Sequence, residues 1–366
     1  MTQIWHVDPQ VPQPDALQPA AETLRRGGLV AFPTETVYGL GADGLQPAAV
    51  RRIFGAKGRP SDNPLILHVA SLEQAKALMG SETPFELVQR LAKAFWPGPL
   101  TLIVPKAGHI PDEVTAGLDT VAVRVPVHPV ARRLIELADR PIAAPSANRS
   151  GRPSPTLANH VLADLDGRID GIVDGGPCGV GLESTVLDIT GPVPLILRPG
   201  GITQEALSDA LQMPVEIDPR AFGHHHAAAD AGPVRSPGMK YRHYAPSTPL
   251  LLCEYDGEPM AARIKQAAQS LREANPGSRI GLFVTDETAE MLGDGHGFVV
   301  SRMGPRRHPE YIAARLFENL RALDDAGLDW VVVEGIRPEG LGLAVMNRLR
   351  RAATVVAPSA THSRNS

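Results

Sequence analysis

The strongest constraint on the fold is an alternation of short apolar runs with amphipathic helical patterns, interrupted once. The alternation extends from about residue 17 to 215 and resumes from 250 to 356. It is typical of β-sheets flanked by helices. Residues 216–249 follow neither period and are rich in Pro, Gly and Ala, as linkers often are. Because 366 residues also exceed the usual size of one domain, we predict two α/β domains joined by a linker, with an extended lead-in at 1–16 and a tail at 357–366.

Individual strands and helices can be placed from the same periods. In the first domain we expect strands at Leu29–Phe32, Leu65–Val69, Leu100–Val104, Val121–Val125, Ile142–Ala144, Gly171–Val173, Thr185–Asp188 and Leu195–Leu197. The helices expected there are Pro47–Gly55, Leu72–Leu78, Phe85–Ala94 and Pro129–Ala138. The second domain alternates more regularly, as a doubly wound domain does. Its expected strands are Leu250–Tyr255, Arg279–Thr285, Gly297–Arg302 and Trp330–Glu334, and its expected helices are Pro259–Glu273, Pro309–Ala326 and Leu341–Ala353.

Charge and composition exclude several classes of protein. The net charge is −4 at pH 7, so the chain as a whole does not coat nucleic acid, and an anion site must be a local group of Lys and Arg. No run approaches the ~18 apolar residues of a membrane span. The amino terminus has neither a basic start nor an apolar signal segment, and Cys178 and Cys253 form no disulfide framework. We expect a cytoplasmic protein that does not bind a membrane.

Gly39, Gly41 and Gly44 have the G-x-G-x-x-G spacing of a dinucleotide-binding turn. Their context does not fit that site, because Pro33-Thr34-Glu35-Thr36 separates the preceding apolar run from the glycines. The next strand ends at His68, where the ribose of a dinucleotide would require Asp or Glu. We therefore expect these glycines to serve turns and close packing, and no P-loop replaces them as a phosphate site.

Polar clusters at the ends of the expected strands are better candidates for chemistry. KGRPSDNPLILH carries Lys57 and Arg59 before a Pro-rich turn, a pair that can hold a polyphosphate, although a solvated basic turn has the same pattern. TVAVRVP places Arg124 in an apolar strand, where it must pair either with a core carboxylate or with an anionic ligand. LILRPGG places Arg198 at another strand end with the same requirement.

Other expected loops, at or near strand ends, carry hydroxyl, amide and carboxylate side chains. They occur in PTET with Thr36, in APSANRSGRPSPT, and in GLESTVLD with Glu183 and Ser184. The second of these segments suits phosphate or ribose but equally suits a helix cap. Within the linker, SPGMKYRHYAP concentrates Lys240 and Tyr244 with further basic and aromatic residues, as a lid over a charged ligand would.

Other signals are weak. The run His224–His226 lacks partners at metal-ligand spacing, and Cys178 has no neighbouring His to activate it. Many cations and hydroxyls with almost no nucleophile indicate a site that positions anions. Such a site suits nucleotidyl or phosphoryl transfer, in which orientation and charge neutralisation do most of the catalysis.

These clusters, in this order, closely resemble the threonylcarbamoyl-AMP synthase family, in its two-domain form. The matching segments are FPTETVYGLGAD, KGRPSDNPLILH, FWPGPLT, VAVRVP, APSANRSG, GLESTVLD, LRPGG, SPGMKYRHYAP and EGLGLAVMNRLRRAA. The resemblance extends from about residue 17 to 356. It implies a YrdC-like twisted α/β domain followed by a smaller Rossmann-like domain. It also implies a nucleotidyltransferase that condenses L-threonine, bicarbonate and ATP to threonylcarbamoyl-adenylate and pyrophosphate.

The resemblance assigns roles to individual residues of this chain. Lys57 and Arg59 are expected to be catalytic. Threonine is expected to contact Thr36, His68, Arg124, Ala144 and Ser184. ATP is expected to contact Arg59, Asn63, Thr120, Ser146, Asn148, Ser154, Arg198, Lys240 and Tyr244. Mg²⁺ is expected to accompany ATP, held by phosphates and water rather than by protein ligands.

The family resemblance also implies partners. A separate complex would transfer the threonylcarbamoyl group to the adenosine beside the anticodon of tRNA, and the acidic net charge leaves this chain only a weak tRNA contact. Two other functions are compatible with parts of the pattern. One is a non-enzymatic module that binds double-stranded RNA or tRNA in a basic cavity. The other is carbamoyl transfer in protein maturation, for which the expected zinc-finger cysteines are missing from the sequence.

Overall fold

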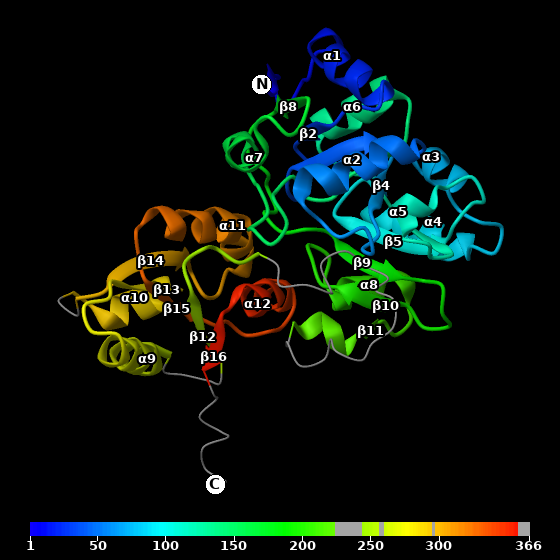
Figure 1. Ribbon diagram of the computed structural model, residues 1–366. Helices are drawn as coiled ribbons and strands as arrows, with labels where there is room; N and C mark the ends of the chain where they lie inside the picture. Colours follow the sequence, from blue (N-terminus) through cyan, green and yellow to red (C-terminus); the bar gives the residue numbers. More distant parts are fainter. Residues whose placement is uncertain (224–243, 256–259, 295–296, 358–366) are drawn as a thin grey trace. The chain divides into compact units, whose positions relative to one another are not determined.

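The computed structural model describes residues 1–223, 244–255, 260–294 and 297–357. The chain divides into two compact units. The N-terminal unit contains the described residues up to 221, and the C-terminal unit contains the described residues from 222 onward (Figure 1). Both units are α/β, which confirms the predicted fold class. Lys240 and the His224–His226 run lie outside the described residues.

A mixed sheet forms the centre of the N-terminal unit. In the described residues it has eleven strands in the order β1-β8-β2-β3-β7-β4-β6-β5-β9-β10-β11. The strands are β1 (Gln3–His6), β2 (Val30–Phe32), β3 (Gly39–Asp43), β4 (Ile66–His68), β5 (Leu100–Pro105), β6 (Thr120–Arg124), β7 (Ile142–Ala143), β8 (Gly171–Asp174), β9 (Thr185–Asp188), β10 (Leu195–Arg198) and β11 (Glu216–Ile217).

The helices of this unit cover the two faces of the sheet unequally. They are α1 (Pro14–Arg25), α2 (Pro47–Lys57), α3 (Leu72–Ala77), α4 (Phe85–Phe95), α5 (Asp112–Thr115), α6 (Pro129–Ala138), α7 (Ala158–Leu165) and α8 (Gln204–Leu211), followed by a 3-10 turn at Pro219–Phe222. Side chains of α2, α4, α7 and α8 build the main core with one face. On the other face, α1 and α6 pack together over β2, β7 and β8. The neighbouring part of that face, on β4, β6, β5, β9 and β10, carries the polar residues described below.

The segment boundaries differ from the sequence prediction at both ends of this unit. Residues 1–16 are not a separate lead-in, because β1 pairs in parallel with β8 and α1 already begins at Pro14. Residues 216 and 217 do not belong to a linker, because β11 pairs in parallel with β10. Both strands lie at the edges of the sheet and are too short to show a clear period in the sequence.

The glycine-rich segment is a strand rather than a turn. Gly39 and Gly41 lie inside β3, which pairs antiparallel with β2 and β7. A dinucleotide-binding turn would require a helix at that point. The strand therefore supports the prediction that the G-x-G-x-x-G spacing is not a dinucleotide site. The expectation of close packing also holds. A methyl group on Gly41 would lie 2.7 Å from Phe32 and 2.8 Å from Ile142.

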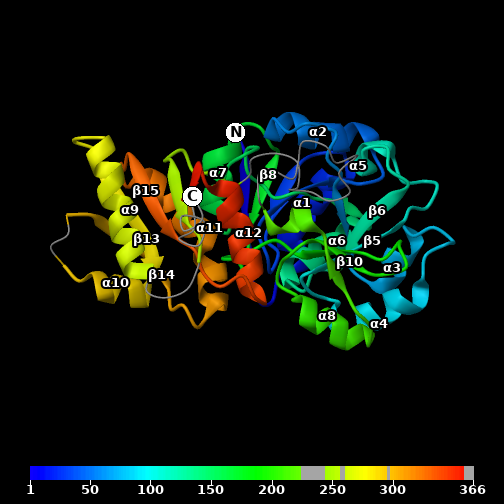
Figure 2. The same ribbon diagram turned by 90° about the horizontal axis from the view of Figure 1, so that it is seen from below.

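The C-terminal unit has a doubly wound arrangement. Its five described strands are all parallel, in the order β14-β13-β15-β12-β16. They are β12 (Leu250–Cys253), β13 (Ile280–Thr285), β14 (Val299–Gly304), β15 (Trp330–Glu334) and β16 (Val355–Ala357). Helices α9 (Met260–Ala274) and α10 (Asp286–Leu292) cover one face, and α11 (Pro309–Asp325) and α12 (Leu341–Ala352) cover the other (Figures 1 and 2).

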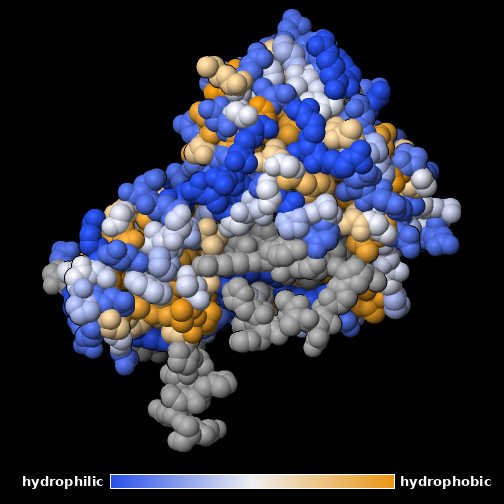
Figure 3. All heavy atoms as spheres, in the orientation of Figure 1, coloured by the Kyte–Doolittle hydropathy of each residue, from blue (hydrophilic) through white to orange (hydrophobic). Residues whose placement is uncertain are grey.

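None of the described helices is long and apolar enough to cross a bilayer. On the face drawn in Figure 3, hydrophobic residues are interspersed with hydrophilic ones over both units.

Candidate active site

Several of the predicted threonine residues, together with Arg198 of the predicted nucleotide residues, gather on one face of the N-terminal sheet. Alternation along β6 directs Val121 and Val123 into the main core, and Ala122 and Arg124 to the opposite face. The neighbouring strand β4 pairs in register, so His68 lies directly beside Arg124. Across the sheet, the apolar side chains on this face form a small cluster of Ile66, Ile103, Ala122, Val186 and Leu197. The sheet thus provides a rigid, partly apolar base for a polar site.

Arg124 is the central charge of this site. Its side chain is 4% exposed, and its Nη2 lies 2.6 Å from Oε1 of Glu35, which is itself 11% exposed. This contact is an ion pair without the alignment of a hydrogen bond. Nη1 donates to the Thr36 hydroxyl at 3.0 Å and Nε to the Gly98 carbonyl at 3.2 Å. Of the two alternatives left open for Arg124, the structure shows the carboxylate of Glu35, and Nη2 retains a hydrogen-bonding direction for a ligand.

The PTET segment forms a tight turn that positions Thr36. The Thr34 hydroxyl donates to the Val37 carbonyl at 2.7 Å and lies 2.8 Å from the Thr36 hydroxyl. Such short-range bonds from Thr to its own backbone are typical of turns. The hydroxyl of Thr36 therefore lies between Thr34 and the guanidinium of Arg124.

His68 is buried and uncharged. Burial, and then the nearby charge of Arg124, lower the pKa of His68 to about 3, against a partial opposing effect of the Ile66 and Ile142 carbonyls. Its ring meets Phe32 edge to face, with centroids 6.5 Å apart. At neutral pH this residue offers a hydrogen bond but no charge.

Ser184 and Arg198 form the other side of the site. The Ser184 hydroxyl lies 2.7 Å from that of Thr101 and accepts from Arg198 Nη2 at 3.1 Å. Arg198 Nε donates to the Ser184 carbonyl, also at 3.1 Å. Ala144 follows β7 directly and is buried, with its N–H bonded to the Ile66 carbonyl at 3.0 Å. These bonds connect the end of β7 to β4, and the end of β10 to the residue before β9.

Lys57 is the last residue of α2 and holds the loop after β7. Its ammonium group donates to the carbonyls of Ser146 and Asn148, the second at 2.6 Å. In return, Ser150 N donates to the Lys57 carbonyl at 2.9 Å. The left-handed C-cap at Gly58 (φ 61°) ends the helix and turns the chain toward Arg59. Lys57 thus contacts the loop that carries Ser146 and Asn148, two of the residues expected to bind ATP.

Two asparagines of the expected nucleotide site have unsatisfied polar atoms. Both amide atoms of Asn63 are buried and have no hydrogen-bond partner among the described residues. Asn148 donates to the carbonyls of Arg149 and Arg152, each at 2.9 Å, and its buried Oδ1 also has no partner there. Arg59 donates to the carbonyls of Asn63 and Pro64 at 3.2 Å. Buried polar atoms normally find partners, so these atoms indicate a place for a polar ligand.

Ser154 is buried and donates to Glu183 Oε1 at 2.5 Å. Glu183 precedes Ser184 at the start of β9, so this bond connects the loop after β7 to the Ser184 side of the site. Glu35, Thr101 and Glu183 are the polar residues of this site for which the sequence predicted no role. PTET and GLESTVLD contain two of them, and a buried Thr in an apolar strand was the available signal for the third.

Two further ATP contacts were expected, one on β6 and one in the C-terminal unit. Thr120 is on the same face of β6 as Arg124 but at its other end, about 13 Å away at about 3.3 Å per residue. Tyr244 is buried in the C-terminal unit, where its ring lies 5.2 Å from that of Phe317 and 5.8 Å from the Arg348 guanidinium. Its role in binding ATP stays a prediction, as does that of Thr120.

No cluster of three or more His, Cys, Asp or Glu residues that could hold a metal occurs in the part of the chain that the structure describes. Burial raises the pKa of the Cys178 thiol, which disfavours the thiolate that a nucleophile requires. The described residues therefore offer a site that orients anions and polar groups without an activated nucleophile.

Comparison with known proteins agrees with this geometry. The Sua5, YciO and YrdC family model, described as telomere recombination, matches residues 22–200, and the model of the C-terminal domain of threonylcarbamoyl-AMP synthase matches residues 202–354. The threonylcarbamoyl-AMP synthase of Pyrococcus abyssi is 48% identical over 339 residues, which are 91% of this chain and 93% of that protein. That of Bacillus subtilis is 48% identical over 347 residues, covering 94% and 93%.

A solved structure gives the same result at the level of the fold. Sua5 of Pyrococcus abyssi complexed with L-threonine superposes with a TM-score of 0.87 at 44% identity, covering 98% of this chain and 100% of that one. The sequence match and the structural match both extend over the two units. The chain therefore belongs to the threonylcarbamoyl-AMP synthase family, in its two-domain Sua5 form.

Proposed function

We propose that this protein is an L-threonylcarbamoyladenylate synthase that converts L-threonine, bicarbonate or CO2, and ATP into threonylcarbamoyl-AMP and pyrophosphate. Membership of the family supports this function. The observation that carries it in the structure is the buried Arg124, with His68 and Thr36 beside it and a free hydrogen-bonding direction on Nη2. A small amino acid has a carboxylate for the guanidinium and a hydroxyl and amine for neutral polar neighbours.

The threonine half of the site is formed by adjacent strands. Arg124 would bind the carboxylate of threonine, with Thr36 fixing the guanidinium from one side. The neutral imidazole of His68 and the hydroxyl of Ser184 would contact the other polar groups. An uncharged His68 matters because the amine of threonine must be neutral to react, and an imidazolium beside it would repel the incoming ammonium form.

The nucleotide half would be formed by the two loops that Lys57 and Arg59 hold. The unsatisfied amides of Asn63 and Asn148, and the hydroxyls of Ser146 and Ser154, would contact ribose or phosphate. Arg198 donates to Ser184 and would therefore lie where the two halves meet. Mg²⁺ would enter with ATP as part of the substrate and bind phosphate oxygens and water.

The reaction then needs placement more than covalent catalysis. The neutral amine of threonine attacks the carbon of CO2 and loses a proton, which gives a carbamate. A carbamate oxygen attacks the α-phosphorus of ATP, the bond from that phosphorus to the bridging oxygen breaks, and pyrophosphate leaves. Because a carbamate is short-lived in water, a buried site that holds it in line with the phosphate supplies the main advantage.

We further propose that the product is passed to a separate complex that modifies tRNA beside the anticodon. The alternative of a purely RNA-binding module has less support, because the principal charges of this site are buried and paired rather than exposed on a basic surface. Salt-sensitive RNA binding without ATP turnover would favour that alternative.

The decisive experiment is mass spectrometry of the product formed from ATP, L-threonine and ¹³C-bicarbonate. We expect threonylcarbamoyl-AMP that carries the label, with pyrophosphate release dependent on threonine. Arg59→Ala should nearly abolish both, whereas Arg51→Ala, which removes a surface arginine paired with Glu113, should leave them unchanged. Pyrophosphate release at the same rate without threonine would refute the proposal.

A further inference from the structure

The C-terminal unit contains a cavity of about 390 Å³ at the carboxyl ends of its strands. Most of its lining comes from segments that follow a strand, and Pro309, Glu339 and Gly342 at the starts of α11 and α12 complete it. Tyr255 follows β12, Arg306 and Arg307 follow β14, and Ile336 and Arg337 follow β15. None of these residues belongs to the active site described above.

The topology of the sheet explains why a cavity opens there. Strands β12 and β15 are parallel neighbours. The chain leaves β12 toward α9 on one face and leaves β15 toward α12 on the other (Figures 1 and 2). Connections that diverge to opposite faces leave a crevice outside the carboxyl ends of the strands, and open α/β sheets bind ligands in such crevices.

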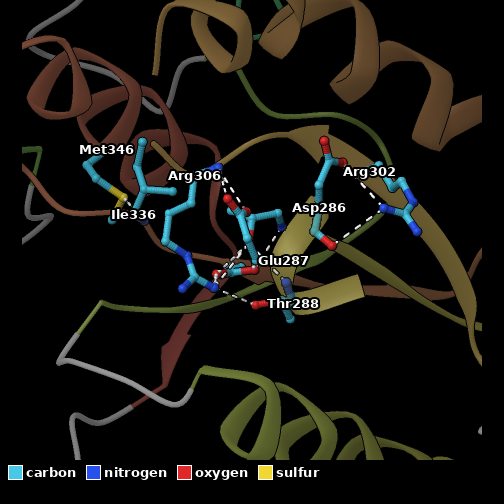
Figure 4. A network of polar contacts seen from close by, with 9 residues as sticks. Asp286, Glu287, Thr288, Arg302, Arg306, Ile336 and Met346 are labelled. Atoms are coloured by element: carbon cyan, nitrogen blue, oxygen red, sulfur yellow. Dashed lines mark hydrogen bonds and ion pairs between the residues drawn. The ribbon is translucent and has the colours of Figure 1, made fainter. Parts of the chain in front are cut away.

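A buried network fixes one cationic wall of this cavity. Arg306 Nη2 donates to Glu334 Oε1 at 2.9 Å and to the hydroxyls of Thr285 and Thr288 at 3.2 and 2.8 Å (Figure 4). Glu287 accepts from the Arg306 backbone N–H at 2.9 Å. Glu334 is fully buried at the end of β15, and its charge offsets that of Arg306. Arg306 thus shapes the cavity while its own charge is largely balanced.

The remaining positive charge of the lining comes from Arg307 and Arg337, and it exceeds the single negative charge of Glu339. Both side chains are exposed. Arg337 lies 3.8 Å from Glu339, and an ion pair so exposed to water contributes little to stability. The guanidinium of Arg337 also lies over the ring of Tyr255, 5.8 Å from its centroid. The cavity therefore places two exposed guanidinium groups, one of them in contact with Glu339 and Tyr255, beside an aromatic ring.

We propose that this cavity is a second nucleotide site, distinct from the active site. Arg307 and Arg337 would bind the phosphates, since guanidinium forks match phosphate oxygens. The ring of Tyr255 would stack against the base, a contact available to any nucleobase. The ligand is a free mononucleotide of the adenine class, which the proposed reaction already brings to the protein.

Calorimetric titration of the full-length protein with ATP tests the proposal. We expect two sites in the unaltered protein and one site in Arg59→Ala, which lacks the active-site contact. Adding Arg307→Glu and Arg337→Glu to that variant should weaken the remaining site at least tenfold. Arg315→Glu, an exposed arginine of α11 outside the cavity, is the matched control and should leave it unchanged. One site in the unaltered protein, or a second site insensitive to both charge reversals, would overturn the proposal.

A second titration separates the base from the phosphate. Tyr255→Ala, in the Arg59→Ala background, should weaken ATP binding while inorganic pyrophosphate binds as before. If ATP and pyrophosphate bind equally well and Tyr255→Ala affects neither, the cavity is a phosphate site and the nucleotide assignment is wrong. Both arginines are exposed, so the thermal unfolding of the charge-reversal variants should match that of the unaltered protein. Tyr255 packs partly against the core of the unit, so Tyr255→Ala should unfold at a lower temperature, and its titration is made well below that temperature.

Discussion

Glu35→Gln tests whether the carboxylate of Glu35 is the counter-charge of Arg124. The substitution keeps the shape of the side chain and an oxygen that can accept from the backbone N–H of Val127, which donates to Glu35 at 3.3 Å. What it removes is a negative charge 2.6 Å from the guanidinium. Because both side chains are almost fully buried, water can replace that charge only poorly.

The expected cost follows from this burial. Removing one member of a buried ion pair typically costs about 3–5 kcal/mol, and retention of the amide hydrogen bond favours a value near ~3 kcal/mol. For a unit of this size, each kcal/mol lowers the melting temperature by about 2–4 °C, so we expect a decrease of about 6–12 °C. Glu113→Gln is the matched control. Its pair with Arg51 is on the surface, and its loss should cost less than about 1 kcal/mol.

Threonine provides the sharper test of the same variant. If the carboxylate of threonine binds Arg124, it restores in Glu35→Gln the charge that the substitution removed. Saturating threonine, measured by thermal unfolding, should then raise the melting temperature of the variant more than that of the unaltered protein. An equal or smaller rise would refute this reasoning and would indicate that Glu35 contacts the substrate amine instead.

Three further predictions concern neighbouring residues. In the unfolded chain His68 binds a proton near pH 6.5, whereas in the folded protein its pKa is about 3. The free energy of unfolding is therefore highest above pH 6.5 and falls by about 1.4 kcal/mol per pH unit between pH 6.5 and pH 3. In urea titrations at several pH values, His68→Gln should lose less stability over this range than the unaltered protein does. Lys57→Met should weaken ATP binding in calorimetry but not threonine binding, because it releases the carbonyls of Ser146 and Asn148; equal weakening of both would contradict this role. Gly41→Ala should destabilise the fold by about 1–3 kcal/mol in denaturant unfolding, because its methyl group would meet Phe32; an unchanged midpoint would show that the core can adjust.

The architecture could be predicted from the sequence because buried strands and covering helices leave clear periods. Strands such as β4 and β6 carry apolar residues on both faces, and a charged or polar residue stands out in them. The strand β3 was not predicted, since GLGAD has the composition of a turn. The packing of neighbouring side chains explains why small residues are needed in this strand. The side chains of Phe32 and Ile142 occupy the space that a side chain at Gly41 would need.

The site residues could be predicted as types but not as pairs. The buried position of Arg124 implied an anionic partner, and the sequence left open whether a core residue or a ligand supplies it. Glu35 lies far earlier in the chain, and its distance from Arg124 depends on how β2, β7, β4 and β6 are ordered in the sheet. Likewise, Lys57 was expected near a phosphate. Its contact with carbonyls of the loop after β7 depends on where α2 ends, which the sequence does not show.

The two halves of the proposed site differ in how they are supported, and this difference bears on the order of binding. Arg124 and His68 lie on paired strands, and Thr36 is held by a hydrogen-bonded turn, so the threonine half is formed before any ligand arrives. The nucleotide half lies on loops, where the buried amides of Asn63 and Asn148 have atoms without partners among the described residues. A preformed site binds its ligand without an ordering cost, whereas unsatisfied loop atoms gain most when a ligand supplies their hydrogen bonds. We therefore expect threonine to bind measurably in the absence of ATP, and ATP to add order to the loops that follow α2 and β7.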